Sequence, residues 1–113
     1  MAYARFSLVR VPFPFTDRAS QKHRPALVIS DPTFQHTSGH LLLAMVTTAT
    51  HSAWPLDWPI QQLDSTGLKH ACVIRFKLFT LDERLCLSQL GVLSGVDARG
   101  VCQRLEALVP RSS

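Results

Sequence analysis

One segment, His40–Thr48 (HLLLAMVTT), limits the possible folds of this chain more than any other. It is apolar at consecutive positions, it is entered through the turn-like stretch Thr37–Gly39, and it ends in β-branched residues. A strand with this pattern has no polar face to turn toward water, so both of its faces must be covered. The sequence therefore predicts a central β-strand in the middle of the core.

Two segments nearer the N-terminus also have the pattern of strands. Phe6–Val11 (FSLVRV) alternates in part, and Ala26–Ile29 (ALVI) is apolar throughout. The prolines that follow the first segment interrupt backbone pairing, because proline lacks the N–H group that a sheet uses. We therefore expect a loop over Pro12–His23 to connect the two strands.

The fourth predicted strand, Ala71–Leu81 (ACVIRFKLFTL), has both of its cations on one face and only apolar residues on the middle of the other. Arg75 and Lys77 fall on the same face, because successive residues of a strand point in opposite directions. We expect this partly polar face to be accessible and to be the working face of the sheet. It also carries Val73 and Phe79, and the opposite face carries Cys72, Ile74, Phe76 and Leu78.

The last quarter of the chain predicts a bent strand followed by a helix. Leu85–Leu93 contains Gly91, which favours a bent strand over a helix. Ser94, with an acidic residue three positions later, has the pattern of a helix N-cap, and apolar residues then recur at helical spacing. Gly100 weakens this helix, which therefore needs packing against the sheet. Together these elements predict one mainly β domain over residues 1–113, a small, strongly curved sheet or barrel with a C-terminal helix.

Composition excludes several classes of protein. With 46% hydrophobic and 18% charged residues, the chain can bury enough apolar surface to fold, which excludes intrinsic disorder. No apolar run has the length of a signal peptide or a membrane span, which predicts a cytoplasmic protein. The widely spaced Cys72, Cys86 and Cys102 predict reduced thiols rather than disulfides or a zinc site, and leave a catalytic cysteine open. The net charge of +4 permits an anionic partner.

The basic cluster Lys22-His23-Arg24-Pro25 is the best candidate for an anion site, since it directly precedes a buried strand. Pro25 biases the backbone of Arg24 toward extended conformations, so the guanidinium has less freedom to lose on binding phosphate. The alternative is a solvated charge cluster. Thr47 and Thr48 end the central strand, where one hydroxyl can emerge as a hydrogen-bond donor, and the alternative there is strand propensity alone.

A histidine pair and two tryptophans are further candidates, for a metal site and for an RNA-binding surface respectively. His36 and His40 have a metal-ligand spacing, but Thr37–Gly39 interrupts the helical face on which they would converge, so we expect no metal site. Trp54 and Trp58 offer surfaces on which nucleobases stack. The sequence favours the other interpretation, that these tryptophans cap the core or form a dimer contact.

The order of several motifs resembles the MazF/PemK-like toxin family. Val11–Asp17 (VPFPFTD) and Lys22–Ser30 (KHRPALVIS) are similar to the opening of these toxins, and the pair is specific in combination. Ala44–Thr48 (AMVTT) resembles the second block of the family. The third block is resembled by Gly67-Leu68, Val73–Arg75, Leu78–Asp82 and Leu90–Ser94, so the likeness covers nearly the whole chain.

This resemblance implies an SH3-like small β-barrel that forms a homodimer and is the toxin of a type II toxin–antitoxin pair. Such a protein binds a cognate antitoxin and inhibits translation by cleaving single-stranded RNA, including mRNA, at a short sequence without a metal or other cofactor. Its catalytic residues match Arg24 and Thr47, with Thr48 as a secondary candidate because a one-residue shift exchanges the threonines. The expected RNA contacts are Lys22, His23, Asp17, Arg75 and Lys77. The alternative is a non-catalytic barrel of the same fold, similar to CcdB-like gyrase poisons.

The residue types implied by the resemblance suit metal-free RNA cleavage. The ribose 2′-OH attacks the adjacent phosphorus, and a guanidinium with a hydroxyl meets the developing negative charge, which predicts 2′,3′-cyclic phosphate and 5′-OH products. His23 has a suitable pKa for a base, but as the neighbour of Arg24 on an extended strand it is expected on the opposite face.

The chain departs from the family pattern in two places. Phe6-Ser7 stands where Gly-Asp is usual before the first strand, and Cys72 stands where serine is frequent. Near the C-terminus, Leu108–Arg111 also resembles a protease site of the kind found in expression tags, although a native helix that ends at a proline explains the same residues.

Overall fold

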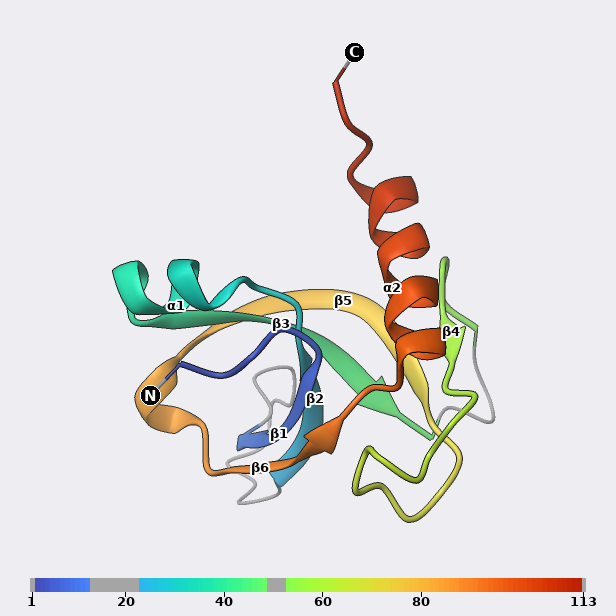
Figure 1. Ribbon diagram of the computed structural model, residues 1–113, viewed down its shortest axis with the longest axis horizontal. Helices are drawn as coiled ribbons and strands as arrows, with labels where there is room; N and C mark the ends of the chain where they lie inside the picture. The colour runs from blue at the N-terminus through green and yellow to red at the C-terminus, as the bar shows by residue number, and fades with distance from the viewer. Residues whose placement is uncertain (1, 13–22, 49–52, 113) are drawn as a thin grey trace.

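The computed structural model describes residues 2–12, 23–48 and 53–112. Its strands form one six-stranded antiparallel sheet in the order β4-β5-β3-β2-β1-β6. Figure 1 shows that the sheet curls, with β5 arching across the molecule and α2 standing beside β4. The elements are β1 (Ser7–Pro12), β2 (His23–Val28), α1 (Pro32–Ser38), β3 (His40–Thr47), β4 (Trp58–Pro59), β5 (Val73–Asp82), the 3₁₀ turn η1 (Glu83–Leu85), β6 (Ser88–Val92) and α2 (Gly95–Leu108).

The predicted central strand is confirmed. β3 lies inside the sheet between β5 and β2, and its two faces belong to different apolar clusters. Ala44 and Val46 point into the larger cluster, whereas Leu41 and Leu43 point into the smaller one on the other side of the sheet. All four are at most 3% exposed. The consecutive apolar residues of this segment therefore follow from burial on both faces.

β2 begins earlier than the sequence predicts. The strand expected over Ala26–Ile29 starts at His23, and Arg24 pairs with Val11 of β1. Pro25 is therefore within the strand instead of marking its entry, and an extended backbone is compatible with its fixed φ. The consequence for the site is that Arg24 sits on a hydrogen-bonded strand and not in a loop.

A bulge in β5 changes which of its side chains are accessible. The register with β3 shifts between two neighbouring pairs, since Ala44 pairs with Leu78 but Met45 pairs with Arg75. The extra residues interrupt the strict alternation from which an accessible polar face was predicted. Arg75 is only 7% exposed, so the predicted accessibility of this face is wrong at Arg75.

The entry to β1 has a backbone conformation that favours glycine. Phe6 has a φ of 72°, in the left-handed region, at one of the two positions where Gly-Asp is usual in the resembled family. Its N–H donates a 2.7 Å hydrogen bond to the carbonyl of Val28, and its side chain packs against the larger apolar cluster. The hydroxyl of buried Ser7 donates to the carbonyl of Ala4 at 2.7 Å. Phe6 and Ser7, which stand where Gly-Asp is usual, are thus held at the entry to β1 by hydrogen bonds.

Three short elements, α1, β4 and η1, were not expected from the sequence. α1 has only seven residues, too few for apolar periodicity to reveal it. Its local signals are nevertheless present: the Asp31 carboxylate accepts from the N–H of Thr33 at 2.9 Å, and Pro32 occupies the first turn. Gly39, with a φ of 74°, ends the helix before β3 begins.

The predicted C-terminal helix is confirmed as α2, and it begins at its predicted N-cap. The Ser94 hydroxyl accepts from the N–H of Asp97, and the helix packs against β4 through Gly100. A Cβ on Gly100 would lie 2.2 Å from the ring of Trp58, so only glycine allows the helix to come this close. No helix in the described residues has the length and apolar character needed to cross a bilayer.

This close contact predicts the effect of Gly100→Ala. Alanine raises helix propensity by about 1 kcal/mol, but the half-buried Trp58 ring must shift to make room, so we expect the free energy of unfolding to fall by about 1 to 3 kcal/mol. Gly95→Ala is the matched control, since its Cβ would meet nothing closer than 3.7 Å. Urea unfolding measures both variants. Equal stability of Gly100→Ala and the original chain would contradict the packing role.

Candidate functional site

Arg24 of β2 and Thr47 of β3 lie near the same end of two neighbouring strands. The two strands pair antiparallel, with Ala26 opposite Met45, and continuing this register by two residues brings Arg24 level with Thr47. Residues directly opposite one another on neighbouring strands point to the same face. A guanidinium and a hydroxyl therefore meet at the same end of the sheet.

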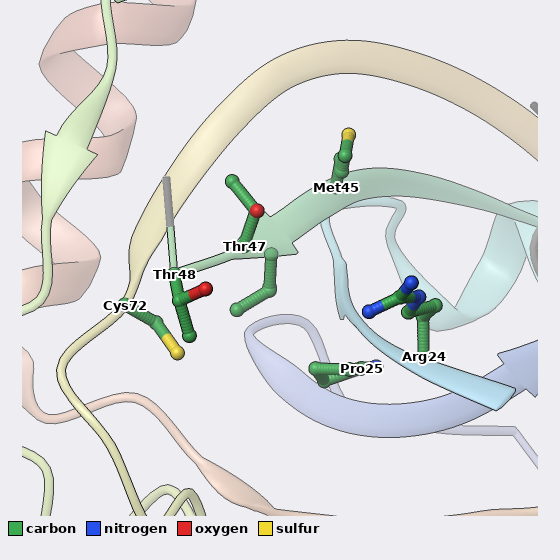
Figure 2. Close-up of a pocket in the computed structure, with 7 residues that line it drawn as sticks. Arg24, Pro25, Met45, Thr47, Thr48 and Cys72 are labelled. Carbon is green, nitrogen blue, oxygen red and sulfur yellow. The ribbon is translucent and has the colours of Figure 1, made fainter. Parts of the chain in front are cut away.

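A cavity of about 210 Å³ lies at this position. Figure 2 shows Arg24 and Pro25 on one side of it and Thr47 and Thr48 on the other. Arg24 is exposed, Thr47 is half-buried, and Thr48, just beyond the end of β3, is exposed. An anion that enters this cavity meets one positive charge and two hydroxyls. The full lining consists of Arg24, Pro25, Met45, Val46, Thr47, Thr48 and Cys72.

Cys72 forms part of the wall of this cavity. Burial raises the pKa of the Cys72 thiol, so the thiol stays protonated at neutral pH. Its Sγ lies 3.3 Å from the carbonyl oxygen of His70, to which it donates. A protonated, hydrogen-bonded thiol is a poor nucleophile, which argues against the catalytic-cysteine interpretation for this residue. The structure records all three cysteines as free.

A second cavity, of about 440 Å³, shares Arg24 and Pro25 with the first and is the more basic of the two. His23 lines the second cavity but not the first, so its ring is separated from Thr47. Arg10 and Lys69 are exposed on its rim, and the sequence analysis missed both. The sequence does carry a signal for Arg10, which is the one charged residue in the otherwise apolar run LVRV of β1. The other lining residues are Gly67, Leu68 and Leu90.

Arg75 makes a buried ion pair instead of presenting its charge to solvent. Its Nη2 donates to Oδ2 of Asp57 at 2.9 Å and its Nε donates to Oδ1 at 3.2 Å. The hydrogen bond to Asp57 raises the pKa of Arg75 above its usual range, with burial opposing and the charge of Asp57 adding to the shift. Arg75 is therefore held by Asp57, a partner that the sequence analysis did not assign.

Of the remaining predicted RNA contacts, the structure describes Lys77 but not Lys22 or Asp17. Lys77 is half-buried, with its ammonium 4.5 Å from the ring centre of Trp54. Lys22 and Asp17 lie outside the described residues. Trp58 packs against α2 and the larger core, as expected of a tryptophan that caps the core, whereas Trp54 is 40% exposed.

The described part of the chain contains no group of three or more His, Cys, Asp or Glu residues arranged to hold a metal ion. His36 belongs to α1 and His40 begins β3, with the helix-ending Gly39 between them. The first cavity itself offers a ligand one guanidinium and two hydroxyls.

Comparisons with known proteins agree on one family and one fold. The model of the PemK-like, MazF-like toxin of type II toxin–antitoxin systems matches residues 4–109. A mycobacterial endoribonuclease solved with its cognate antitoxin has a TM-score of 0.74 at 14% identity, over 99% of this chain and 97% of that one. A MazE–MazF complex from Deinococcus radiodurans gives 0.73 at 22% identity, over 99% of each chain. The Mycobacterium tuberculosis toxin MazF-mt6 gives 0.72 at 14% identity, over 95% of this chain and 99% of that one. Comparison with curated proteins by sequence finds no match.

Proposed function

The chain belongs to the PemK-like, MazF-like toxin family of type II toxin–antitoxin systems, and we propose that it is an endoribonuclease that cleaves single-stranded RNA at the Arg24–Thr47 cavity. The observation that carries this proposal is that an exposed guanidinium and a half-buried hydroxyl line the same cavity, which is open to solvent. The mycobacterial structure with the same fold is itself described as an endoribonuclease. Nothing in the described residues favours the gyrase-poison alternative.

The chemistry of the step follows from the two side chains. The ribose 2′ oxygen attacks phosphorus and loses its proton to a base, the bond to the 5′ oxygen breaks, and that oxygen takes up a proton. Negative charge grows on the nonbridging oxygens in the transition state. Arg24 donates two hydrogen bonds to these oxygens and Thr47 donates one, which lowers the barrier. Arginine, with a pKa above about 12, is a poor proton acceptor, so the role of Arg24 is electrostatic.

The second cavity supplies a path for the RNA backbone away from the cleaved bond. It continues from Arg24 and presents Arg10, His23 and Lys69 at its surface. Exposed cations that follow a groove bind successive phosphates without regard to base sequence. Arg10 and Lys69 therefore take over part of the role that the sequence analysis gave to Arg75.

The other elements of the proposal concern partners and location. The chain acts in the cytoplasm as a homodimer, and a cognate antitoxin binds it and competes with RNA. The support for an antitoxin partner comes from similar folds solved as toxin–antitoxin complexes. The support for an RNA substrate is the basic surface around Arg24.

The test of this function is an incubation of the purified chain with a long single-stranded RNA in the presence of EDTA. We expect discrete fragments that carry 2′,3′-cyclic phosphate and 5′-OH ends, because no step of the mechanism needs a metal ion. RNA that stays intact at a large excess of protein would contradict the proposal. Inhibition of DNA gyrase with intact RNA would support the alternative instead.

Paired substitutions separate the two threonines. Thr47→Val removes a hydroxyl at nearly constant shape, so we expect kcat to fall by about 10- to 100-fold while RNA affinity is retained. Thr48→Val serves as the matched control and should change kcat by less than about threefold, since Thr48 lies beyond the strand register that fixes Thr47. Single-turnover cleavage of a defined RNA measures both. A larger loss for Thr48→Val would reverse the assignment.

A further inference from the structure

We propose that Trp54 is a platform on which one nucleobase of the RNA stacks, next to the cleavage cavity; this inference rests on the proposed function. Trp54 is 40% exposed, so part of its ring is open to a ligand. The ammonium of Lys77 lies 4.5 Å from the centre of its ring. An exposed aromatic ring beside a cation is the combination with which proteins bind single-stranded nucleic acid.

A network of polar contacts holds Trp54 in place before any ligand binds. The N–H of Trp54 donates to Oδ2 of Asp57, and the N–H of Asp57 donates back to the carbonyl of Trp54, each at 3.2 Å. Leu56 closes this turn with a φ of 67°, in the left-handed region. Asp57 is in turn fixed to β5 by its two hydrogen bonds from Arg75. A ring held in this way loses little conformational freedom when a base stacks on it.

The same network sets the position of Trp54 relative to the cavity. Arg75 pairs with Met45 of β3, so its side chain leaves the sheet on the face that carries Met45 and Thr47. Met45 itself lines the cleavage cavity. Trp54 is therefore linked, through Asp57 and Arg75, to the face of the sheet on which the cavity lies.

Trp58, in contrast to Trp54, has contacts that show a structural role. The Nε1–H of Trp58 donates to the buried Asp97 at 2.9 Å, and its ring touches Gly100 of α2. Trp54 contributes to neither apolar cluster. Among its recorded contacts, the ammonium of Lys77 lies over its ring and the carboxylate of Asp57 accepts from its backbone N–H. Packing in the core therefore explains Trp58 but not Trp54.

Binding of uncleavable RNA tests the inference. A 12-nucleotide 2′-O-methyl RNA of random sequence lacks the attacking hydroxyl, so its affinity is measured without cleavage. We expect it to quench tryptophan fluorescence, and we expect Trp54→Ala to raise Kd by about 5- to 100-fold and to abolish the quenching. Trp54→Phe should retain most of the affinity, because it keeps an aromatic face. Phe34→Ala, which truncates a 44% exposed aromatic residue on α1, is the matched control and should leave Kd unchanged.

An abasic oligonucleotide of the same length separates base stacking from attraction to phosphate. We expect it to bind the original chain and Trp54→Ala equally and to quench neither. Equal affinity of both proteins for the 2′-O-methyl RNA would overturn the inference and leave Trp54 to a protein contact. An equal loss of affinity for the abasic strand would overturn it as well, by showing a structural effect. Base-dependent quenching without cleavage of ordinary RNA would refute the proposed nuclease activity and uphold the stacking site.

Discussion

Arg24→Ala should slow RNA cleavage by about 10²- to 10³-fold while the protein remains folded. The loss has this size because the substitution removes a preorganised, charged donor aimed at the oxygens on which negative charge develops. Arg24 is exposed and belongs to neither apolar cluster, so its truncation leaves the core intact. Single-turnover cleavage with EDTA present measures the rate, and urea unfolding measures the stability.

Two further variants make this prediction specific to the guanidinium. Arg24→Lys keeps the charge but loses the planar, bidentate geometry, so we expect an intermediate rate. Arg84→Ala removes another exposed arginine, in η1 beyond the end of β3 that lies opposite Thr47, and should leave the rate unchanged. A rate for Arg24→Ala within about threefold of the original would exclude Arg24 from the mechanism.

The central strand, the bent last strand and the C-terminal helix could be predicted because each depends on local patterns. Consecutive apolar residues mark β3, and Gly91 lies where β6 meets a shift of register with β1. Ser94 marks the first turn of α2. What could not be predicted depends on contacts between distant segments. α1 is too short to show a period, and the two residues of β4 are placed by their pairing with β5.

In the site, too, the residues marked by local sequence patterns could be predicted, and those placed by contacts between distant segments could not. Arg24 was singled out by its position before a buried strand and Thr47 by the family resemblance, and the folded chain brings both to one cavity. Arg75 was predicted to be accessible from alternation alone, but alternation cannot reveal a bulge or a carboxylate that arrives from 18 residues away. Asp57 holds the Arg75 guanidinium away from solvent through two hydrogen bonds. The Asp57 carboxylate also accepts from the N–H of Trp54, which fixes the turn over residues 54–57. Arg75, predicted to contact RNA, thus forms an ion pair that holds the turn carrying Trp54.

Substitution of Asp97 should cause the largest loss of stability among these predictions. Asp97 is fully buried, and its Oδ1 accepts from the indole N–H of Trp58 at 2.9 Å and from the backbone N–H of Gln61 at 2.8 Å. Its Oδ2 accepts from the N–H of Gln62 at 3.0 Å and lies 3.2 Å from the Ser94 hydroxyl, which donates to it. Asp97→Ala leaves these buried donors without an acceptor, so we expect the free energy of unfolding to fall by about 3 kcal/mol or more.

The contribution of Asp97 should also depend on pH. Burial alone would raise the pKa of its carboxyl, but the hydrogen bonds from Gln61, Trp58, Gln62 and Ser94 outweigh burial and lower the pKa. A carboxyl whose pKa is lower in the folded state stabilises the protein above its unfolded pKa of about 4, and this stability is lost as the pH falls through the folded-state value. The stability difference between the original chain and Asp97→Asn should therefore be constant near neutral pH and shrink below about pH 4. Asp64→Asn, at an exposed position, should run parallel to the original chain across that range. A difference that does not narrow in acid would mean that Asp97 stabilises the β4–α2 contact through shape and neutral hydrogen bonds, and not through its charge.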